Sequence, residues 1–143
     1  MKTAKMIKPD QIYYTRGKSV SKIGTPTFEG KTVTILPTID VSLTFKEVSR
    51  KGYTTVTESG KGPEPPARYK IRLYYRIKTT AVHSAPVEIR IILQSDFVTS
   101  HPRLWRWYPA KKRWENITKH FSKKYRLLIG ETRDCLESVF GVT

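Results

Sequence analysis

The feature that most constrains the fold is an alternation of apolar and charged residues in the middle of the chain. Between Tyr69 and Lys78 the apolar side chains occupy every second position, and most positions between them are basic. The segment from Val87 to Leu93 has the same alternation. Successive side chains of a strand point to opposite faces, so a period of two is typical of a strand with one buried face. We therefore predict two strands here and expect them to be antiparallel neighbours.

Other segments also favour β-structure. Apolar and polar residues alternate from Lys31 to Phe45, and the β-branched segment Tyr53–Thr57 follows Arg50-Lys51-Gly52, which we interpret as a hairpin turn. Ser59–Pro66 contains two glycines and three prolines, so it is predicted to be an exposed loop. The segments 103–108 and 113–117 flank Pro109-Ala110-Lys111-Lys112 and predict a further, aromatic hairpin.

The period lengthens after Thr118. Apolar residues then recur three and four positions apart in two stretches, Phe121, Tyr125 and Leu128, and then Leu136, Val139 and Phe140. This spacing is typical of one face of a helix, and Gly130 is a suitable end for the first one. The predicted fold class is mainly β with a C-terminal helix (α+β), as an antiparallel β-sandwich or half-open barrel with one or two short C-terminal helices.

The first 30 residues show no sustained period of 2 or 3.6, and prolines and glycines alternate there with scattered charge. We predict a basic, partly irregular N-terminal arm over residues 1–30 and a single β-rich domain over residues 31–143. The arm carries Lys2, Lys5, Lys8, Arg16, Lys18 and Lys22 and is a candidate flexible electrostatic contact.

The charge balance points to an anionic partner. The chain has 27 Lys and Arg against 12 Asp and Glu, a formal net charge of +15. Residues 101–126 alone hold nine basic and one acidic side chain. Such an excess exceeds what solubility requires and destabilises the fold by self-repulsion, which a bound polyanion would relieve.

The same residues give little sign of catalysis or of cofactors. Cys135 is the only cysteine, and His83, His101 and His120 are not in a metal-ligand spacing. No phosphate-binding glycine loop is present, so we expect no enzyme activity, no cofactor and no metal. A hydrolase or nuclease using carboxylates and a histidine stays open as a minor alternative. One cysteine, no signal-peptide pattern and no uncharged apolar run of bilayer length predict an intracellular location, in cytoplasm or nucleus, or a virion if the protein is viral.

Three basic constellations are the candidate polyanion site. The first is the charged face of the central strand, which Arg90 of the next strand would share: Lys70, Arg72, Tyr74, Arg76, Lys78 and Arg90. The second belongs to the aromatic hairpin: Arg103, Arg106, Tyr108, Lys111, Lys112, Arg113 and Trp114. The third surrounds the predicted helix: Lys119, Lys123, Lys124 and Arg126. We expect Trp105 and Trp107 to be core residues because they share one strand parity, which makes Trp114 and Tyr108 the candidates for exposure.

The leading hypothesis is a non-enzymatic nucleic-acid-binding protein that uses this basic surface with interspersed rings. RNA or single strands are favoured over duplex DNA because unpaired bases can stack on aromatic rings. In size and charge the chain also resembles small structural proteins of viruses, a likeness of composition that includes no motif. The alternative is therefore a viral-type matrix or coat protein that forms homo-oligomers and binds an anionic membrane surface, nucleoprotein or both.

Overall fold

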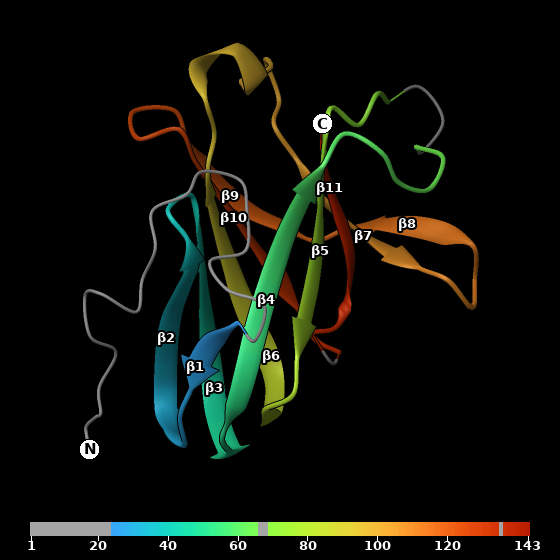
Figure 1. Cartoon of the computed structure of the whole chain (residues 1–143). Coiled ribbons are helices and arrows are strands. Elements are labelled where there is room, and N and C mark those ends of the chain that lie inside the picture. Colours follow the sequence, from blue (N-terminus) through green and yellow to red (C-terminus); the bar gives the residue numbers. More distant parts are fainter. Residues whose placement is uncertain (1–23, 66–68, 135) are drawn as a thin grey trace.

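The computed structural model describes residues 24–65, 69–134 and 136–143. These residues form two antiparallel β-sheets that pack as a sandwich, with one short 3₁₀ turn at Ser95–Phe97 (Figure 1). The prediction of a mainly β, antiparallel sandwich is confirmed.

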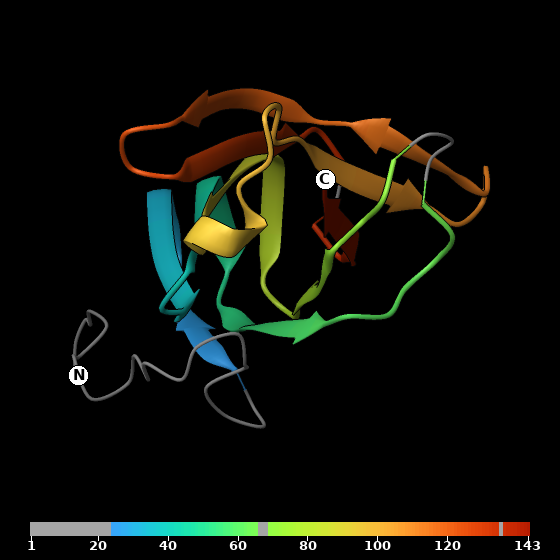
Figure 2. The same ribbon diagram turned by 90° about the horizontal axis from the view of Figure 1, so that it is seen from above.

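In each sheet the order of neighbouring strands differs from their order along the chain. Figure 2 shows the two sheets from above. Sheet A has the strand order β1 (Thr25–Thr27), β4 (Gly52–Ser59), β5 (Leu73–Thr79), β11 (Ser138–Val142), β7 (Leu104–Tyr108) and β8 (Arg113–Asn116). Sheet B has the strand order β2 (Gly30–Thr38), β3 (Val41–Arg50), β6 (Val82–Ile92), β10 (Leu127–Thr132) and β9 (Thr118–Ser122).

The two alternating strands in the middle of the chain are not neighbours, so that prediction is wrong. Strand β5 pairs with β4 and β11 in sheet A, whereas β6 pairs with β3 and β10 in sheet B. The short link at Thr80-Ala81 carries the chain across the sandwich. The link at Lys51 between β3 and β4 does the same, so the predicted hairpin turn there is also wrong. Alternation shows which side chains face the core, but both sheets of a sandwich satisfy it equally.

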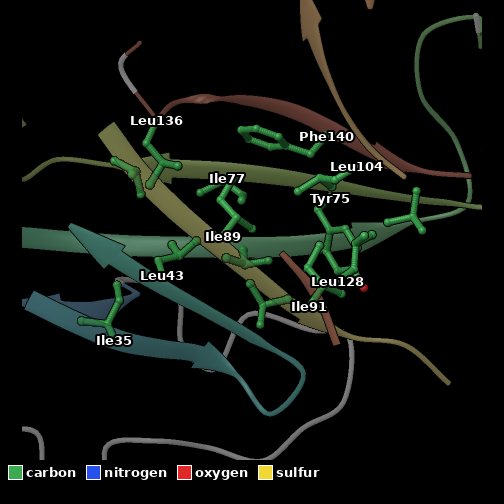
Figure 3. Packing of buried hydrophobic residues seen from close by; sticks show 14 of the residues in the cluster. Ile35, Leu43, Tyr75, Ile77, Ile89, Ile91, Leu104, Leu128, Leu136 and Phe140 are labelled. Carbon is green, nitrogen blue, oxygen red and sulfur yellow. The ribbon is translucent and has the colours of Figure 1, made fainter. Parts of the chain in front are cut away.

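The main core lies between the two sheets (Figure 3). The alternating apolar residues supply it from Leu73 onward, with Ile77 from β5 and Ile89 and Ile91 from β6 fully buried. The predicted alternation fails before Leu73, because Ile71 belongs to a second cluster and Tyr69 is exposed. Phe140 from β11 and Leu128 from β10 complete its centre. Each such side chain contributes roughly 1.5–3 kcal/mol by leaving water, so these two periodic segments carry much of the stability.

The aromatic hairpin is confirmed, since β7 pairs with β8 and Trp107 lies opposite Trp114. Its second strand then leads directly into sheet B. At Ile117 the backbone N–H donates to Leu104 O at 2.9 Å and the carbonyl accepts from Glu131 N at 3.0 Å. Ile117 thus joins β7 of sheet A to β10 of sheet B, and β8 and β9 run almost as one strand along this side of the sandwich (Figure 2).

The predicted C-terminal helices are absent from the described residues. The segments for which they were predicted form β9, β10 and β11 instead. Phe121 and Leu128 are directly opposite each other across β9 and β10, so their separation reflects a turn between two strands. Strand β11 lies between β5 and β7, and its consecutive residues Val139 and Phe140 are both buried. A strand covered on both faces has adjacent apolar residues, which imitate part of a helical pattern.

The predicted N-terminal arm lies mostly outside the described residues, including all six of its basic side chains. Its last part is regular: Thr25–Thr27 forms β1, which pairs with β4, and Gly30 begins β2. The structure therefore places residues 25–27 at the edge of sheet A.

Candidate nucleic-acid interface

The outer face of sheet A gathers rings and cations from the three strands β5, β7 and β8. Cross-strand partners share a face, and the register places Arg76 beside Thr57 and Val139 and places Tyr74 beside Gly141. We call the rings and cations that face outward from β5, β7 and β8, together with the adjoining Tyr69, the basic-aromatic face: Tyr69, Tyr74, Arg76, Lys78, Trp105, Trp107 and Trp114. The strand register places no acidic residue among the outward-facing positions of sheet A that the structure describes.

Two of these rings form the floor of the face and are covered. Tyr74 is 6% exposed and Trp114 is 9% exposed, because residues 60–65 pass over them. The Tyr74 hydroxyl donates to Pro63 O at 3.0 Å, and Trp114 Nε1 donates to Glu64 O at 2.6 Å. Burial of Tyr74 also raises the pKa of its hydroxyl. The predicted exposure of Trp114 is therefore wrong, and neither floor ring is available for stacking in this arrangement.

Three other rings remain open to solvent. Trp105 and Trp107 are partly buried, and Tyr69 is 39% exposed. Tyr69 and Trp105 have ring centroids 5.1 Å apart, and Trp107 lies 5.3 Å from the floor ring of Trp114. The Trp105 indole is oriented by a hydrogen bond from Nε1 to Thr143 Oγ1 at 3.0 Å. These fixed, half-open rings are suited to stacking, since little side-chain entropy remains to be lost.

The expectation that Trp105 and Trp107 belong to the core between the sheets is wrong. They project from the outer face and pack against a second, smaller cluster of Ile71, Tyr74, Trp114 and Val139. The inward positions of β7 are Leu104 and Arg106. The signal that could have shown this is the hairpin register, because a turn that pairs residue 108 with 113 also places Trp107 opposite Trp114 on one face.

The cations of this face are uncompensated. Arg76 and Lys78 are exposed on β5, and neither forms an ion pair with an acidic side chain of the described residues. They are two positions apart on one strand, which corresponds to roughly 6.5–7 Å, comparable with the spacing of successive phosphates. This pair is the part of the predicted cationic row that the strand retains.

The other two cations predicted for this row, Lys70 and Arg72, do not lie on the strand. Strand β5 begins at Leu73, so Lys70 and Arg72 precede it at the upper end of the sandwich in Figure 1. There the Arg72 guanidinium lies 5.5 Å from the centre of the Phe97 ring. Arg103 is also at this end, where Nη1 donates to the carbonyl of His101 at 3.2 Å. These three cations form a group of their own, separate from the strand face.

Arg90 and Lys119 are on the opposite side of the molecule, on the outer face of sheet B, and are neutralised there. Arg90 Nε is 2.6 Å from Glu88 Oε2, and Lys119 Nζ is 3.2 Å from Glu88 Oε1 and 3.8 Å from Glu131 Oε2. Burial disfavours the charged form of Glu88, but the hydrogen bonds from Arg90 and Lys119 outweigh it and lower the pKa of this carboxyl. The predicted sharing of one solvent face by Arg90 and the β5 cations is therefore wrong.

The hairpin residues of the second constellation are largely engaged with each other. Arg106 is 5% exposed and faces inward, where its guanidinium lies 5.0 Å from the Tyr108 ring centre. Burial and a hydrogen bond to Asp134 raise the pKa of the Tyr108 hydroxyl. Glu115 pairs with Lys111 at 3.7 Å and with Arg113 at 3.1 Å. Lys112 occupies the exposed turn with a positive φ of 49°. Arg106 is thus unavailable to a surface ligand.

Lys123, Lys124 and Arg126 are exposed in the turn between β9 and β10 rather than on a helix. The ring of Tyr125 beside them is 64% exposed, and Lys124 Nζ lies 5.3 Å from its centre. The described residues offer these three cations no ion-pair partner. The turn is a second region of uncompensated positive charge, away from the basic-aromatic face.

Comparison of this chain with protein-family models, with curated proteins and with solved structures finds no match. Within the described ranges no group of three His, Cys, Asp or Glu side chains could hold a metal ion. None of the helical structure described is long and apolar enough to cross a bilayer.

Proposed function

We propose that the protein binds single-stranded nucleic acid, RNA in particular, on the basic-aromatic face. The observation that carries this proposal is that one sheet face combines half-open rings with cations that no acidic side chain of the described residues neutralises. Base–aromatic stacking and phosphate neutralisation together are the usual basis of single-strand binding. Arg76 and Lys78 contact phosphates, and Tyr69, Trp105 and Trp107 stack on bases.

The proposal predicts weak sequence preference. Every base has a ring face that can stack, and cations on phosphates do not distinguish bases. The half-open rings belong to β7 and to the segment before β5, so they line an open sheet surface rather than a helix that could enter a groove. This arrangement therefore favours flexible single strands over a duplex, whose bases are stacked inside.

The test is the salt dependence of binding to unrelated 12-nucleotide RNA and DNA oligomers, followed by fluorescence anisotropy. Each phosphate contact on a single strand contributes about 0.7 to the slope of log affinity against log salt, so Arg76→Ala with Lys78→Ala should flatten the slope by about 1.4. The matched control is Lys46→Ala with Lys51→Ala, two exposed lysines elsewhere on the molecule. An unchanged slope in the first variant, or an equal change in both, would exclude this face.

The contribution of stacking is tested at Tyr69. Tyr69→Ala is expected to weaken binding between about 5-fold and 150-fold, the range that 1–3 kcal/mol of stacking implies. Tyr69→Phe keeps the ring and should retain most of the affinity. If the two variants weaken binding equally, the ring does not stack on a base.

One observation favours a second candidate, binding to an anionic membrane surface, as the matrix-type alternative would require. Three exposed apolar residues, Ile39 between β2 and β3, Ile92 at the end of β6 and Tyr125 in the turn between β9 and β10, are 36%, 44% and 64% accessible. The Ile92 N–H donates to Asp40 O at 2.8 Å and Ile92 pairs with Leu127, so these segments meet at one end of sheet B. Lys123 and Lys124 are in the same turn as Tyr125. Apolar residues bordered by lysine can insert between lipid headgroups, and each lysine near an anionic surface adds about 1 kcal/mol.

This candidate is tested by co-sedimentation with phosphatidylserine and phosphatidylcholine vesicles in nuclease-treated samples. Binding that requires phosphatidylserine and is lost in Ile39→Asp with Tyr125→Asp would support it. The control variant is Tyr53→Asp with Val82→Asp, which changes two equally exposed residues, 46% and 47% accessible, outside the patch. No sedimentation with phosphatidylserine vesicles would rule the membrane surface out.

A further inference from the structure

A basic hollow of about 360 Å³ opens at the upper end of the sandwich, beside the basic-aromatic face. Three cations from two chain segments line it, namely Lys70 and Arg72 before β5 and Arg103 before β7. Ser100 and His101 add polar groups, and none of the lining side chains is acidic. The volume lies within the range of small-ligand sites, about 300–1,000 Å³.

Two of the cations are held in place before any ligand arrives. The guanidinium carbon of Arg72 lies 5.5 Å from the centre of the Phe97 ring. The backbone N–H of Arg72 donates to Val142 O at 3.2 Å. Arg103 exchanges two backbone hydrogen bonds with Thr143, at 3.1 and 3.2 Å, while its Nη1 is bonded to His101 O. A site whose donors are already positioned loses less entropy on binding.

The charge of the hollow exceeds that of an internal phosphodiester, which carries one negative charge. A phosphate monoester carries about −1.5 to −2 near pH 7 and has three strong acceptor oxygens. Arginine forks pair with such oxygens in a bidentate manner. The hydroxyl of Ser100, whose Oγ is 3.3 Å from His101 Nδ1, adds a neutral donor. The chemistry of the lining therefore suits a terminal phosphate.

The position of Tyr69 connects the hollow with the stacking rings. Tyr69 lines the hollow, and its ring packs against Trp105 with centroids 5.1 Å apart. A strand that places its terminal phosphate among Lys70, Arg72 and Arg103 can thus stack its first base on Tyr69 and continue along the face.

We propose that this hollow captures the terminal phosphate of a single-stranded nucleic acid whose following bases lie on the basic-aromatic face. The inference rests on the proposed function and specifies its ligand: a strand with a phosphorylated end, held by Lys70, Arg72 and Arg103. An end-specific contact gives the protein a defined starting point on a strand that it otherwise reads without sequence preference.

The experiment compares 12-nucleotide RNAs of one sequence that carry a 5′-phosphate, a 3′-phosphate or hydroxyls at both ends, with an internal dye, by fluorescence anisotropy. The wild type is expected to bind one phosphorylated RNA at least ten times more tightly than the hydroxyl RNA. Lys70→Ala with Arg103→Ala should abolish this ratio and leave affinity for the hydroxyl RNA within about threefold. The matched control, Arg76→Ala with Lys78→Ala, should weaken binding to all three RNAs and keep the ratio.

Failure of this inference can be told apart from failure of the proposed function. Equal wild-type affinity for the three RNAs, or a ratio that survives in the Lys70/Arg103 variant, overturns the end site and leaves the face standing. If no RNA binds but calorimetry detects a nucleoside monophosphate that the same variant cannot bind, the face is wrong and the hollow binds phosphate alone. Because the Arg103 side chain also donates to the His101 carbonyl, its removal can change the local backbone, so Lys70→Glu is measured as well. It changes only an exposed side chain and should also reduce the ratio.

Discussion

Replacing Gly62 by alanine should lift residues 60–65 off the floor of the basic-aromatic face. A Cβ at position 62 would lie 2.3 Å from Tyr74 Cδ1 and 2.5 Å from Cε1, distances that carbon atoms cannot adopt. The Tyr74 ring has little room to retreat, since it is 6% exposed and packs on Trp114 with centroids 6.1 Å apart. The covering segment must therefore move instead.

The cost can be worked out from what the segment contributes. Its displacement breaks the hydrogen bonds from Tyr74 to Pro63 O and from Trp114 to Glu64 O, each worth about 1 kcal/mol. Partial exposure of the two floor rings adds roughly 1 kcal/mol if about 40 Å² of apolar surface returns to water. The expected loss is thus about 2–3 kcal/mol, which lowers Tm by roughly 4–12 °C for a domain of this size.

The assay is thermal and urea unfolding followed by tryptophan fluorescence, which also reports a red shift as Trp114 becomes hydrated. The chain supplies its own control two residues away. A Cβ at Gly60 would meet nothing within 4 Å, so Gly60→Ala should change stability by less than about 0.5 kcal/mol. If Gly62→Ala melts at the same temperature as Gly60→Ala, residues 60–65 do not clamp the floor rings and the reasoning is refuted.

Three further predictions concern polar side chains whose surroundings shift their pKa or leave a donor unpaired. Burial, reinforced by the charges of Glu58 and Asp40, raises the pKa of the Tyr75 hydroxyl; the unfolded chain therefore ionises first, and stability falls as pH rises above about 10. Tyr75→Phe should flatten that alkaline fall in urea midpoints. The lowered pKa of Glu88 means that its contribution is present above about pH 4.3 and is lost as pH falls further, so Glu88→Gln should flatten the acid limb in thermal melts between about pH 5 and 3. Arg106 donates to Thr132 Oγ1, but its Nε has no hydrogen-bond partner among the described residues. Arg106→Leu should therefore leave the Tm measured by calorimetry unchanged or higher, and should leave nucleic-acid affinity intact. Arg106→Ala should lower the Tm, because it leaves a cavity. Equal losses of Tm in the two variants would contradict this reasoning.

Local pattern alone determined several features of this protein. The period-two segments 73–79 and 87–91 form strands whose apolar side chains fill the core, and the prolines and glycines of residues 60–65 end strand β4. The aromatic hairpin also follows from its own sequence, because its turn residues and flanking strands are adjacent. In each case the decisive interactions are between residues close in sequence, so composition and spacing are enough to predict the feature.

The tertiary structure decided which side chains face each other. Nothing in the alternation of β5 and β6 shows that they belong to opposite sheets, and this separation places Arg90 far from Arg76. Arg90 pairs instead with Glu88, two positions away on β6. The apparent helical spacing after Thr118 arises from a hairpin and from a strand buried on both faces. Pairing between strands depends on contacts that are distant in sequence, and a period of two is satisfied equally well in either sheet. The sequence alone therefore determined the amount of positive charge, and only the packing of the sheets decided which cations remain free to bind an anion.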